Sequence, residues 1–421
     1  MTSEQFVWVW LPGRPDPVVA GRVWADRALH RFQYGQSYLS RPDAVGLWGI
    51  PLRPGPQQPP SGMDLHGSLR DGLPDAWGQH VIMARLTGRS GQDADTGDLD
   101  ALTYMRESGS DRFGAIDFQD SPDEYRPRSG SATLAELSEA AAALEAGRPL
   151  SAALDAALAH GTSIGGARPK ATLTDADGNS WIAKFASSSD GALPRVRWEA
   201  FALDLAARAG VVAVQAHMAR AAGRDVLLVR RFDRGPAETR VMTVSALTLL
   251  DLDERLGRYA TYTDLLDKLV SASRDPDAVR VQLFTRIAAN IVLGNTDDHA
   301  RNHAALWDGT YLELSPAYDL DPCRPAGWDA NQAMAYGRDG RRRSNLADLV
   351  GVSAEYGLSR RRGLEIVNEV VTAISAHWAE ALDAAGLTDA QGDALRSSRI
   401  MHPAIFDGLV HPVTGGTWSA G

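Results

Sequence analysis

The chain has 421 residues, 44% hydrophobic and 23% charged, so it can bury a sizeable core and is not disordered as a whole. A single cysteine, Cys323, excludes an intrachain disulfide and a cysteine-rich zinc site, and a formal net charge of −10 argues against DNA as the main ligand. The start of the chain lacks a basic segment followed by an apolar one, and no uninterrupted apolar run reaches about 18 residues, so we expect a cytoplasmic protein without a membrane span.

Short β-type segments, broken by proline and glycine, make up the first 60 residues. The runs FVWVWL, VVAGRVWA and AVGLWGI (residues 6–11, 18–25 and 44–50) predict strands. The next segment, LPDAWGQHVIMARL (73–86), has apolar residues spaced by three and four, which predicts a helix. A second helical region is predicted for the alanine- and leucine-rich residues 131–158.

The pattern changes to a mixture of strands and one helix between residues 160 and 235. The segment ATLTDADGNSWIAKFA (171–186) predicts a hairpin that turns at residues 175–178. An amphipathic helix over 197–210 is stopped by Gly210, and two more strands follow it. From about residue 245 the pattern is mostly helical, apart from two strand-like pieces within 295–322.

Two features in this mixed region are suited to binding phosphate. The segment TSIGGARPK (162–170) places glycines beside a cation, so that backbone N–H groups can approach an anion, although its spacing matches neither standard phosphate-loop motif and an ordinary turn remains open. Lys184 ends a predicted strand, where protein kinases place the lysine that holds phosphates and pairs with a helix glutamate, here Glu199. The alternative is a surface lysine on an edge strand.

Acidic residues in the helical part complete a pattern in a fixed order. Asp297 and Asn302 have the D-x-x-x-x-N spacing of a kinase catalytic loop, in which the aspartate accepts a hydroxyl proton and the asparagine binds Mg²⁺. Asp319 follows a short strand, where a kinase places its second metal ligand. Each feature alone is compatible with a polar turn, whereas their common order predicts a phosphotransferase.

These segments together resemble the HipA family of bacterial toxin serine/threonine kinases. The resemblance rests on TSIGGARPKA, WIAK, RRFDR, NTDDHARN and LSPAYDL, and on GLPDAWG nearer the start of the chain. It implies an α+β, two-lobed protein-kinase-like fold with an additional β-rich subdomain. The expected divisions are an N-terminal HipA-type subdomain (1–130), a small lobe with the glycine loop and the strand lysine (131–235), and a helical large lobe (236–421).

The resemblance also implies a role for each matching residue. Asp297 would be the catalytic base, Asn302 and Asp319 the Mg²⁺ ligands, Lys184 the phosphate-holding lysine and Ser163 an inhibitory autophosphorylation site. The nucleotide-binding residues implied in this way are Ser163, Ile164, Gly165, Gly166, Ala167, Arg168, Pro169, Lys170, Lys184, Arg230, Arg231, Phe232, His299 and Asp319.

ATP and Mg²⁺ are the implied cofactors, and a HipB-like antitoxin with a DNA-binding helix-turn-helix is the implied partner, through which the chain would meet DNA indirectly. The substrate would be a protein, with an aminoacyl-tRNA synthetase suggested by the best-known family member, which phosphorylates glutamyl-tRNA synthetase. Two alternatives stay open. One is a metal-dependent hydrolase that uses Asp297, Asp298, His299 and His303, the two histidines sharing a helix face. The other is a kinase-like binding module without catalytic activity.

Overall fold

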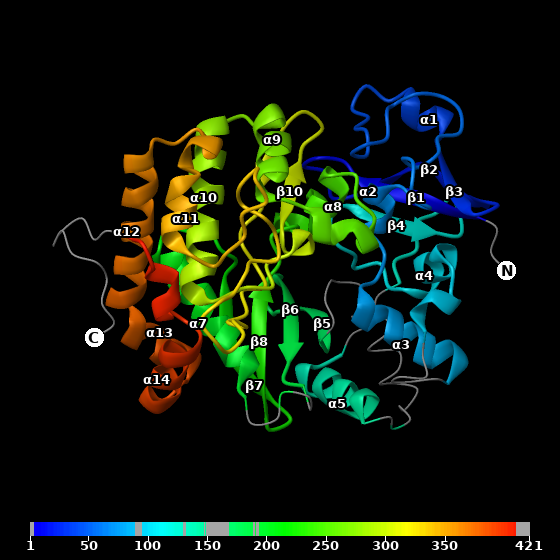
Figure 1. Cartoon of the computed structure of the whole chain (residues 1–421). Coiled ribbons are helices and arrows are strands. Elements are labelled where there is room, and N and C mark those ends of the chain that lie inside the picture. The colour runs from blue at the N-terminus through cyan, green and yellow to red at the C-terminus, as the bar shows by residue number, and fades with distance from the viewer. Residues whose placement is uncertain are drawn as a thin grey trace. The chain divides into compact units, whose positions relative to one another are not determined.

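The chain folds into two compact units, each described separately below. The computed structural model describes residues 4–88, 95–128, 132–146, 148, 168–187, 190 and 193–409. The first unit comprises Met1–Val196, Ala219–Val244 and Leu306–Thr310. The second comprises Arg197–Met218, Ser245–Ala305 and Tyr311–Gly421. Figure 1 shows the helices and strands in chain order and confirms the expected α+β class. The boundaries predicted at residues 130 and 235 stay predictions.

An antiparallel sheet forms the N-terminal part of the first unit. Its strand order is β3-β2-β1-β4. The strands are β1 (Glu4–Trp10), β2 (Pro17–Asp26), β3 (Leu29–Tyr34) and β4 (Ile116–Gln119). The first two predicted strands are therefore confirmed.

The strand predicted for residues 44–50 is wrong, and the strand β3 was missed. Leu47 and Ile50 are buried in the core under the sheet, but their backbone belongs to a loop. The hydroxyl of Tyr34, at the end of β3, donates to the carbonyl of Ile50 at 2.9 Å and accepts from the N–H of Leu47 at 2.8 Å. The apolar character of this run therefore reflects burial of a loop that a tyrosine holds in place.

Helices in the first unit begin and end where their capping residues predict. The helix α3 (Ala76–Thr87) begins after Asp75, which accepts a hydrogen bond from Gly78 N at 2.7 Å, and ends at Gly88 in the left-handed conformation (φ 70°). This confirms the helix predicted over 73–86. The shorter elements nearby are α1 (Gln36–Leu39), α2 (Gly67–Arg70), the 3₁₀ turn Thr96–Asp98 and α4 (Ala101–Glu107).

A second sheet has the strand order β5-β6-β8-β7. Its strands are β5 (Lys170–Thr174), β6 (Ser180–Phe185), β7 (Ala216–Ala221) and β8 (Arg224–Arg230). The predicted hairpin β5–β6 is confirmed, with Gly178 at a φ of 81° in its turn. The helix α5 (Leu134–Glu145) packs on this sheet around a core that includes Leu137. Most of the rest of the helical region predicted to end at 158 lies outside the described residues.

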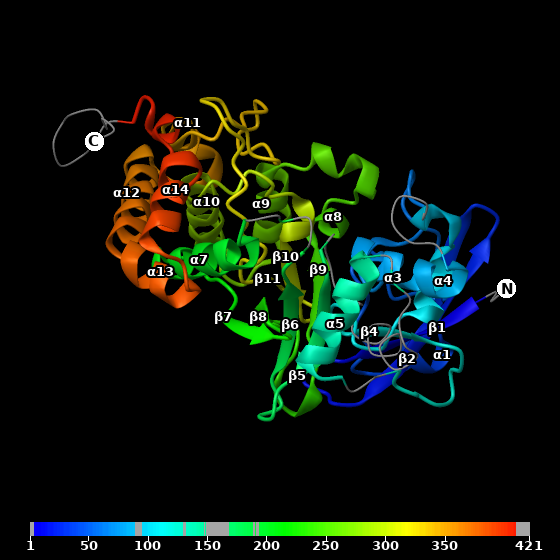
Figure 2. The ribbon, with the colours of Figure 1, turned by 90° about the horizontal axis from the view of Figure 1, so that it is seen from below.

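The second unit is built around one long buried helix. The helix α10 (Pro276–Leu293) packs against α9 (Tyr262–Ala272) and α12 (Arg360–Ala376), as Figures 1 and 2 show. It starts after Asp275, which caps Ala278 N at 3.0 Å, and ends at Gly294 with a φ of 68°. The remaining helices are α7 (Arg195–Arg208), α8 (Ala246–Leu249), α11 (Leu346–Gly351), α13 (Trp378–Ala385) and α14 (Asp389–Ser398).

The chain segments between these helices include short strands and 3₁₀ turns. A third sheet has the order β11-β10-β9. Its strands are β9 (Met242–Ser245), β10 (Ala304–Trp307) and β11 (Leu312–Leu314). The 3₁₀ turns are Pro236–Glu238, Glu254–Tyr259, Ala300–Asn302, Ser353–Tyr356 and Pro403–Phe406. None of the helices in the described part of the chain combines the length and the apolar character that a membrane span requires.

Candidate active site

The loop that follows α10 carries the predicted base and one predicted metal ligand. His299 N donates to the carbonyl of Asp297 at 2.8 Å, and Asn302 N donates to the carbonyl of His299 at 2.8 Å. The side-chain amide of Asn302 also donates to the carbonyl of Asp297, at 3.3 Å. These bonds fold residues 297–302 into a tight turn that brings Asp297 and Asn302 together, as the D-x-x-x-x-N spacing predicts.

Exposure alternates along this loop. Asp297 and His299 are exposed, whereas Asp298 and Ala300 are buried. The loop therefore presents its predicted base to solvent and directs the next residue into the protein. The two adjacent aspartates therefore occupy opposite environments.

Asp298 is the centre of a buried hydrogen-bond network. Its Oδ2 accepts hydrogen bonds from Tyr262 Oη in α9, from Asn290 Nδ2 in α10 and from His303 Nε2, the last at 3.0 Å. On the other side of the ring, Arg286 Nη1 lies 3.4 Å from His303 Nδ1. Because a guanidinium has no acceptor, Nδ1 accepts this bond, and the Nε2 proton faces Asp298.

Burial shapes the chemistry of this network. Loss of water raises the pKa of the Tyr262 hydroxyl well above its ordinary value, and the carboxylate of Asp298 raises it further. Burial also lowers the pKa of Arg286, although Asp298 acts in the opposite direction. The raised pKa of Tyr262 keeps its hydroxyl protonated, so it remains a hydrogen-bond donor to Asp298.

Further carboxylates surround Asp297. Partial loss of water raises the pKa of Asp297, and the carboxylates of Asp319, Asp321 and Asp298 raise it further, while His299 lowers it. Tyr318 Oη donates to the carbonyl of Arg301 at 2.9 Å, which ties the segment that carries Asp319 to the catalytic loop. The structure thus brings the predicted base and both predicted metal ligands, Asn302 and Asp319, into one region of the second unit.

Asn302 and Asp319 would offer an amide and a carboxylate oxygen to a divalent cation of the Mg²⁺ type, although within the described ranges no group of three or more histidine, cysteine, aspartate or glutamate side chains is arranged to hold a metal ion. Magnesium prefers oxygen ligands, and the carboxylates and the amide of this region provide them. Burial is the main cause of the raised pKa of Asp297, and the repulsion from neighbouring carboxylates that adds to it is what a bound cation would relieve. Asp319 also has a φ of 60°, a backbone conformation uncommon outside glycine, and such strain is concentrated at functional sites.

The strand lysine and the end of the glycine loop belong to the first unit. Lys184 on β6 lies opposite Lys170 on β5 in the antiparallel register. Lys170 is buried, and its Nζ lies 3.4 Å from Asp75 Oδ2 at the start of α3. Arg168 Nη2 donates to Asp190 Oδ1 at 2.7 Å. Convergence of Lys184 with the acidic residues of the second unit stays a prediction.

Several predicted nucleotide contacts take other partners or fall outside the description. Arg230 Nη2 donates to Asn179 Oδ1 at 2.8 Å, and the ring of Phe232 lies 6.1 Å from that of Phe113. Pro169 accepts a backbone hydrogen bond from Phe185 at 3.0 Å. The predicted loop residues Ser163, Ile164, Gly165, Gly166 and Ala167 lie outside the described residues.

Arg231, one of the nucleotide-binding residues that the resemblance implies, has a buried structural role through its side chain. Its guanidinium donates to Asp233 at 2.8 Å and 2.9 Å and to Asp111 at 2.6 Å, and its backbone N–H donates to the carbonyl of Ser180 at 2.9 Å. Arg234 also bonds both carboxylates, at 3.1 Å and 2.8 Å. Contact of Arg231 with a nucleotide stays a prediction, while its side chain joins Asp111 to Asp233 within the first unit.

The geometry does not support the metal-hydrolase alternative. His299 and His303 do not share a helix face, because residues 300–302 form a single 3₁₀ turn and His303 is extended. His303 is buried and bonded to Asp298 and Arg286. Within the described ranges, no group of three or more histidine, cysteine, aspartate or glutamate side chains has the arrangement of a metal site.

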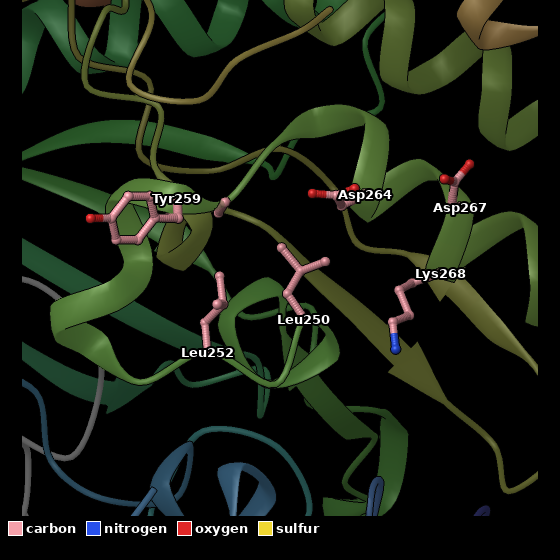
Figure 3. Close-up of a pocket in the computed structure, with 7 residues that line it drawn as sticks. Leu250, Leu252, Tyr259, Asp264, Asp267 and Lys268 are labelled. Carbon is pink, nitrogen blue, oxygen red and sulfur yellow. The ribbon is translucent and has the colours of Figure 1, made fainter. Parts of the chain in front are cut away.

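A separate cavity of about 360 Å³ lies in the second unit, between the segment after α8 and the helix α9. Figure 3 shows Leu250 and Leu252 between Tyr259 on one side and the charged residues of α9 on the other. Lys268 lies 3.9 Å from Asp251, and Asp267 accepts a bond of 2.8 Å from Arg338. None of the predicted catalytic residues lines this cavity, so it forms no part of the candidate site.

The sequence interpretation missed the supports of the catalytic loop. Arg286 and Asn290 stand four residues apart in the mainly apolar segment VQLFTRIAANIVLG, and both are buried. A charged and an amide residue on the apolar face of a core helix are a detectable signal, because buried polar groups require partners. Tyr262 carried no comparable signal.

Known proteins resemble this chain in both sequence and fold. The family model of the HipA-like C-terminal domain matches residues 162–378, which is 217 of the 421 residues. "Putative kinase Y4mE" of Sinorhizobium fredii is 31% identical over 132 residues, covering 29% of this chain and 31% of that protein, so the match spans less than a third of the relative.

Among solved structures, HipA from a Shewanella oneidensis MR-1 complex of HipA, HipB and operator DNA has a TM-score of 0.67 at 18% identity, over 93% of both chains. This similarity supports the kinase-like fold expected from the sequence. The family match covers the catalytic loop, the strand lysine and the segment with Asp319. The chain therefore belongs to the HipA-like family.

Proposed function

We propose that the chain is an ATP- and Mg²⁺-dependent protein kinase that phosphorylates serine or threonine and acts as the toxin of a HipA/HipB-like pair. The observation that carries this proposal is the catalytic loop, where an exposed Asp297 with a raised pKa lies in a tight turn with Asn302 and near Asp319. An exposed carboxylate beside oxygen ligands is the arrangement that phosphoryl transfer to a hydroxyl requires. Membership of the HipA-like family supports the same reaction.

In this proposal Asp297 would orient the acceptor hydroxyl and accept its proton as the oxygen attacks the γ-phosphorus of ATP, while the bond from that phosphorus to the β,γ-bridging oxygen breaks and ADP leaves. The raised pKa makes Asp297 a stronger base than an ordinary aspartate. Asn302 and Asp319 would hold the cation, and Lys184 would pair with the phosphates. Bound Mg²⁺ supplies positive charge that offsets the charge of the transferring phosphoryl group.

Ser163 is proposed as an inhibitory autophosphorylation site. A phosphate there adds nearly two negative charges beside the nucleotide, so repulsion would weaken ATP binding. The partner is proposed to be a HipB-like antitoxin, because the similar Shewanella chain occurs in a complex with HipB and operator DNA. The substrate is proposed to be a protein, with an aminoacyl-tRNA synthetase as the first candidate.

Incubation with γ-labelled ATP and Mg²⁺ tests the proposal. Wild-type protein should incorporate label into itself or into added protein, whereas Asp297→Asn should lose this activity by a factor of at least about 100. Asp383→Asn, which changes an exposed aspartate on α13, is the matched control and should keep full activity.

Equal labelling of wild type and Asp297→Asn would refute the assignment of the base. A wild-type chain that binds ATP but transfers no label would instead favour the binding module without catalytic activity. Mapping the label tests Ser163, and Ser163→Ala should remove the label at that position while labelling of added protein continues.

A further inference from the structure

We propose that Asp298 is the positioning residue of the catalytic loop: its buried carboxylate fixes the loop so that Asp297 faces the acceptor hydroxyl. The catalytic part of this inference rests on the proposed kinase function, whereas the structural part does not. Asp298 directly follows the predicted base in the loop. Its surroundings indicate a specific role.

Hydrogen-bond donors from separate elements converge on one oxygen atom of Asp298. Tyr262 from α9, Asn290 from α10 and His303 from the far end of the loop all donate to Asp298 Oδ2. Asn295 Nδ2 in turn donates to Asn290 Oδ1 at 3.1 Å, so the beginning of the loop is joined to the same network. Donors on α9, on α10 and at the far end of the loop therefore hold the carboxylate of Asp298, and Asn295 supports the donor on α10.

Burial makes a charged Asp298 side chain energetically costly unless other groups stabilise it. Asp298 is 3% exposed, and an isolated carboxylate at such a place would be strongly unfavourable. Arg286 donates from Nη1 to Nδ1 of His303 at 3.4 Å and from Nη2 to the carbonyl of Ser315 at 2.6 Å. The carboxylate is therefore kept in place by a chain of donors that ends in a buried cation.

Exposed and buried side chains alternate along the loop. Asp297 and Asp298 are consecutive, with the first exposed and the second buried. The hydrogen bond from His299 N to the carbonyl of Asp297 spans Asp298, so fixing the buried side chain also restrains the residue that carries the exposed one. The hydrogen bonds from His299 N and Asn302 N form within the same turn, so their protection reports how firmly the loop is held.

A purely stabilising role for Asp298 is the alternative, and the experiment separates the two. Asp298→Asn removes the charge and keeps the shape, and Tyr262→Phe removes one donor and keeps the ring. Asn345→Ala is the control: the Asn345 side chain caps α11 and donates to the carbonyls of Ala404 and Asp407, so its loss lowers stability without touching the network.

Hydrogen exchange of the full chain is the first readout. In Asp298→Asn the amides of His299 and Asn302 should exchange about tenfold faster or more, because a hydrogen-bonded anchor of the loop is lost. Tyr262→Phe should show a smaller change in the same direction. Asn345→Ala should leave these amides as in wild type, and unchanged protection in a folded Asp298→Asn would overturn the proposal.

Single-turnover phosphoryl transfer is the second readout. The rate constant of Asp298→Asn should fall by about 10- to 100-fold, while equilibrium binding of ATP changes less than about threefold. The Asn345→Ala variant should keep its rate at a temperature where it is folded. If wild type transfers no phosphate, the proposed kinase function fails and exchange still decides the positioning role. If Asp298→Asn fails to fold, Tyr262→Phe tests the positioning role in its place. A Tyr262→Phe protein with the hydrogen exchange and the transfer rate of wild type would then overturn the proposal.

Discussion

Replacing Gly294 by alanine should destabilise the second unit more than the same change at another helix-ending glycine. Gly294 has a φ of 68°, and an added Cβ would lie 2.5 Å from the carbonyl oxygen of Arg399. Gly210 has a φ of 85°, yet its Cβ would meet no atom within 4 Å. Both residues follow helices of the same unit, so the pair separates backbone strain from steric overlap.

The magnitudes follow from these two terms. A non-glycine residue in the left-handed region costs about 1–2 kcal/mol, and this term applies to Gly210→Ala and Gly294→Ala alike. Overlap with a backbone carbonyl forces a shift that typically costs about 1–3 kcal/mol more. We therefore expect a loss of about 1–2 kcal/mol for Gly210→Ala and about 2–5 kcal/mol for Gly294→Ala.

Chemical denaturation followed by circular dichroism measures both free energies of unfolding on the full chain. Gly294→Ala should have the lower denaturation midpoint and, because Gly294 directly precedes the catalytic loop, a reduced rate of phosphoryl transfer. If the two variants lost the same free energy of unfolding, the inferred contact with Arg399 would be refuted.

Three more predictions concern charged groups. Arg231→Met should lower the free energy of unfolding by about 3 kcal/mol or less. Breaking a buried ion pair typically costs about 3–5 kcal/mol, but Arg234 remains beside Asp111 and Asp233 in this variant. An unchanged denaturation midpoint would contradict this prediction. Burial raises the pKa of Asp111 and Asp233, but the neighbouring arginines lower it further, to below the ordinary value of an aspartate. The stabilisation that the two ionised carboxyls contribute is therefore complete above about pH 4 and is lost as the pH falls further. Thermal melts at pH 3 and pH 6 measure this loss. Asp297→Asn should abolish phosphoryl transfer yet raise the melting temperature at pH 7, because the raised pKa of Asp297 means that folding disfavours its ionised form; a lower melting temperature would contradict this sign.

Local patterns in the sequence predicted those elements whose causes are local. The helix over 73–86 and the hairpin over 171–186 are confirmed, because a capping aspartate, a helix-ending glycine and a turn glycine act within a few residues. The strand predicted over 44–50 is wrong because alternating apolar residues report burial, and a loop held by Tyr34 can bury them as well as a strand. Strand β3 was missed because its pairing with β2 contributes as much to its order as its composition.

By itself, the sequence determined which side chains make up the candidate site: Asp297 and Asn302 at the spacing of a catalytic loop, with Asp319 further along the chain. That spacing predicted their proximity because the turn between them closes through short-range hydrogen bonds. The tertiary structure alone decided that Asp298 is buried and that Tyr262 contacts it, although the two are separated by 36 residues. Such a contact depends on how two helices pack, and the residues between them contain no local signal of it.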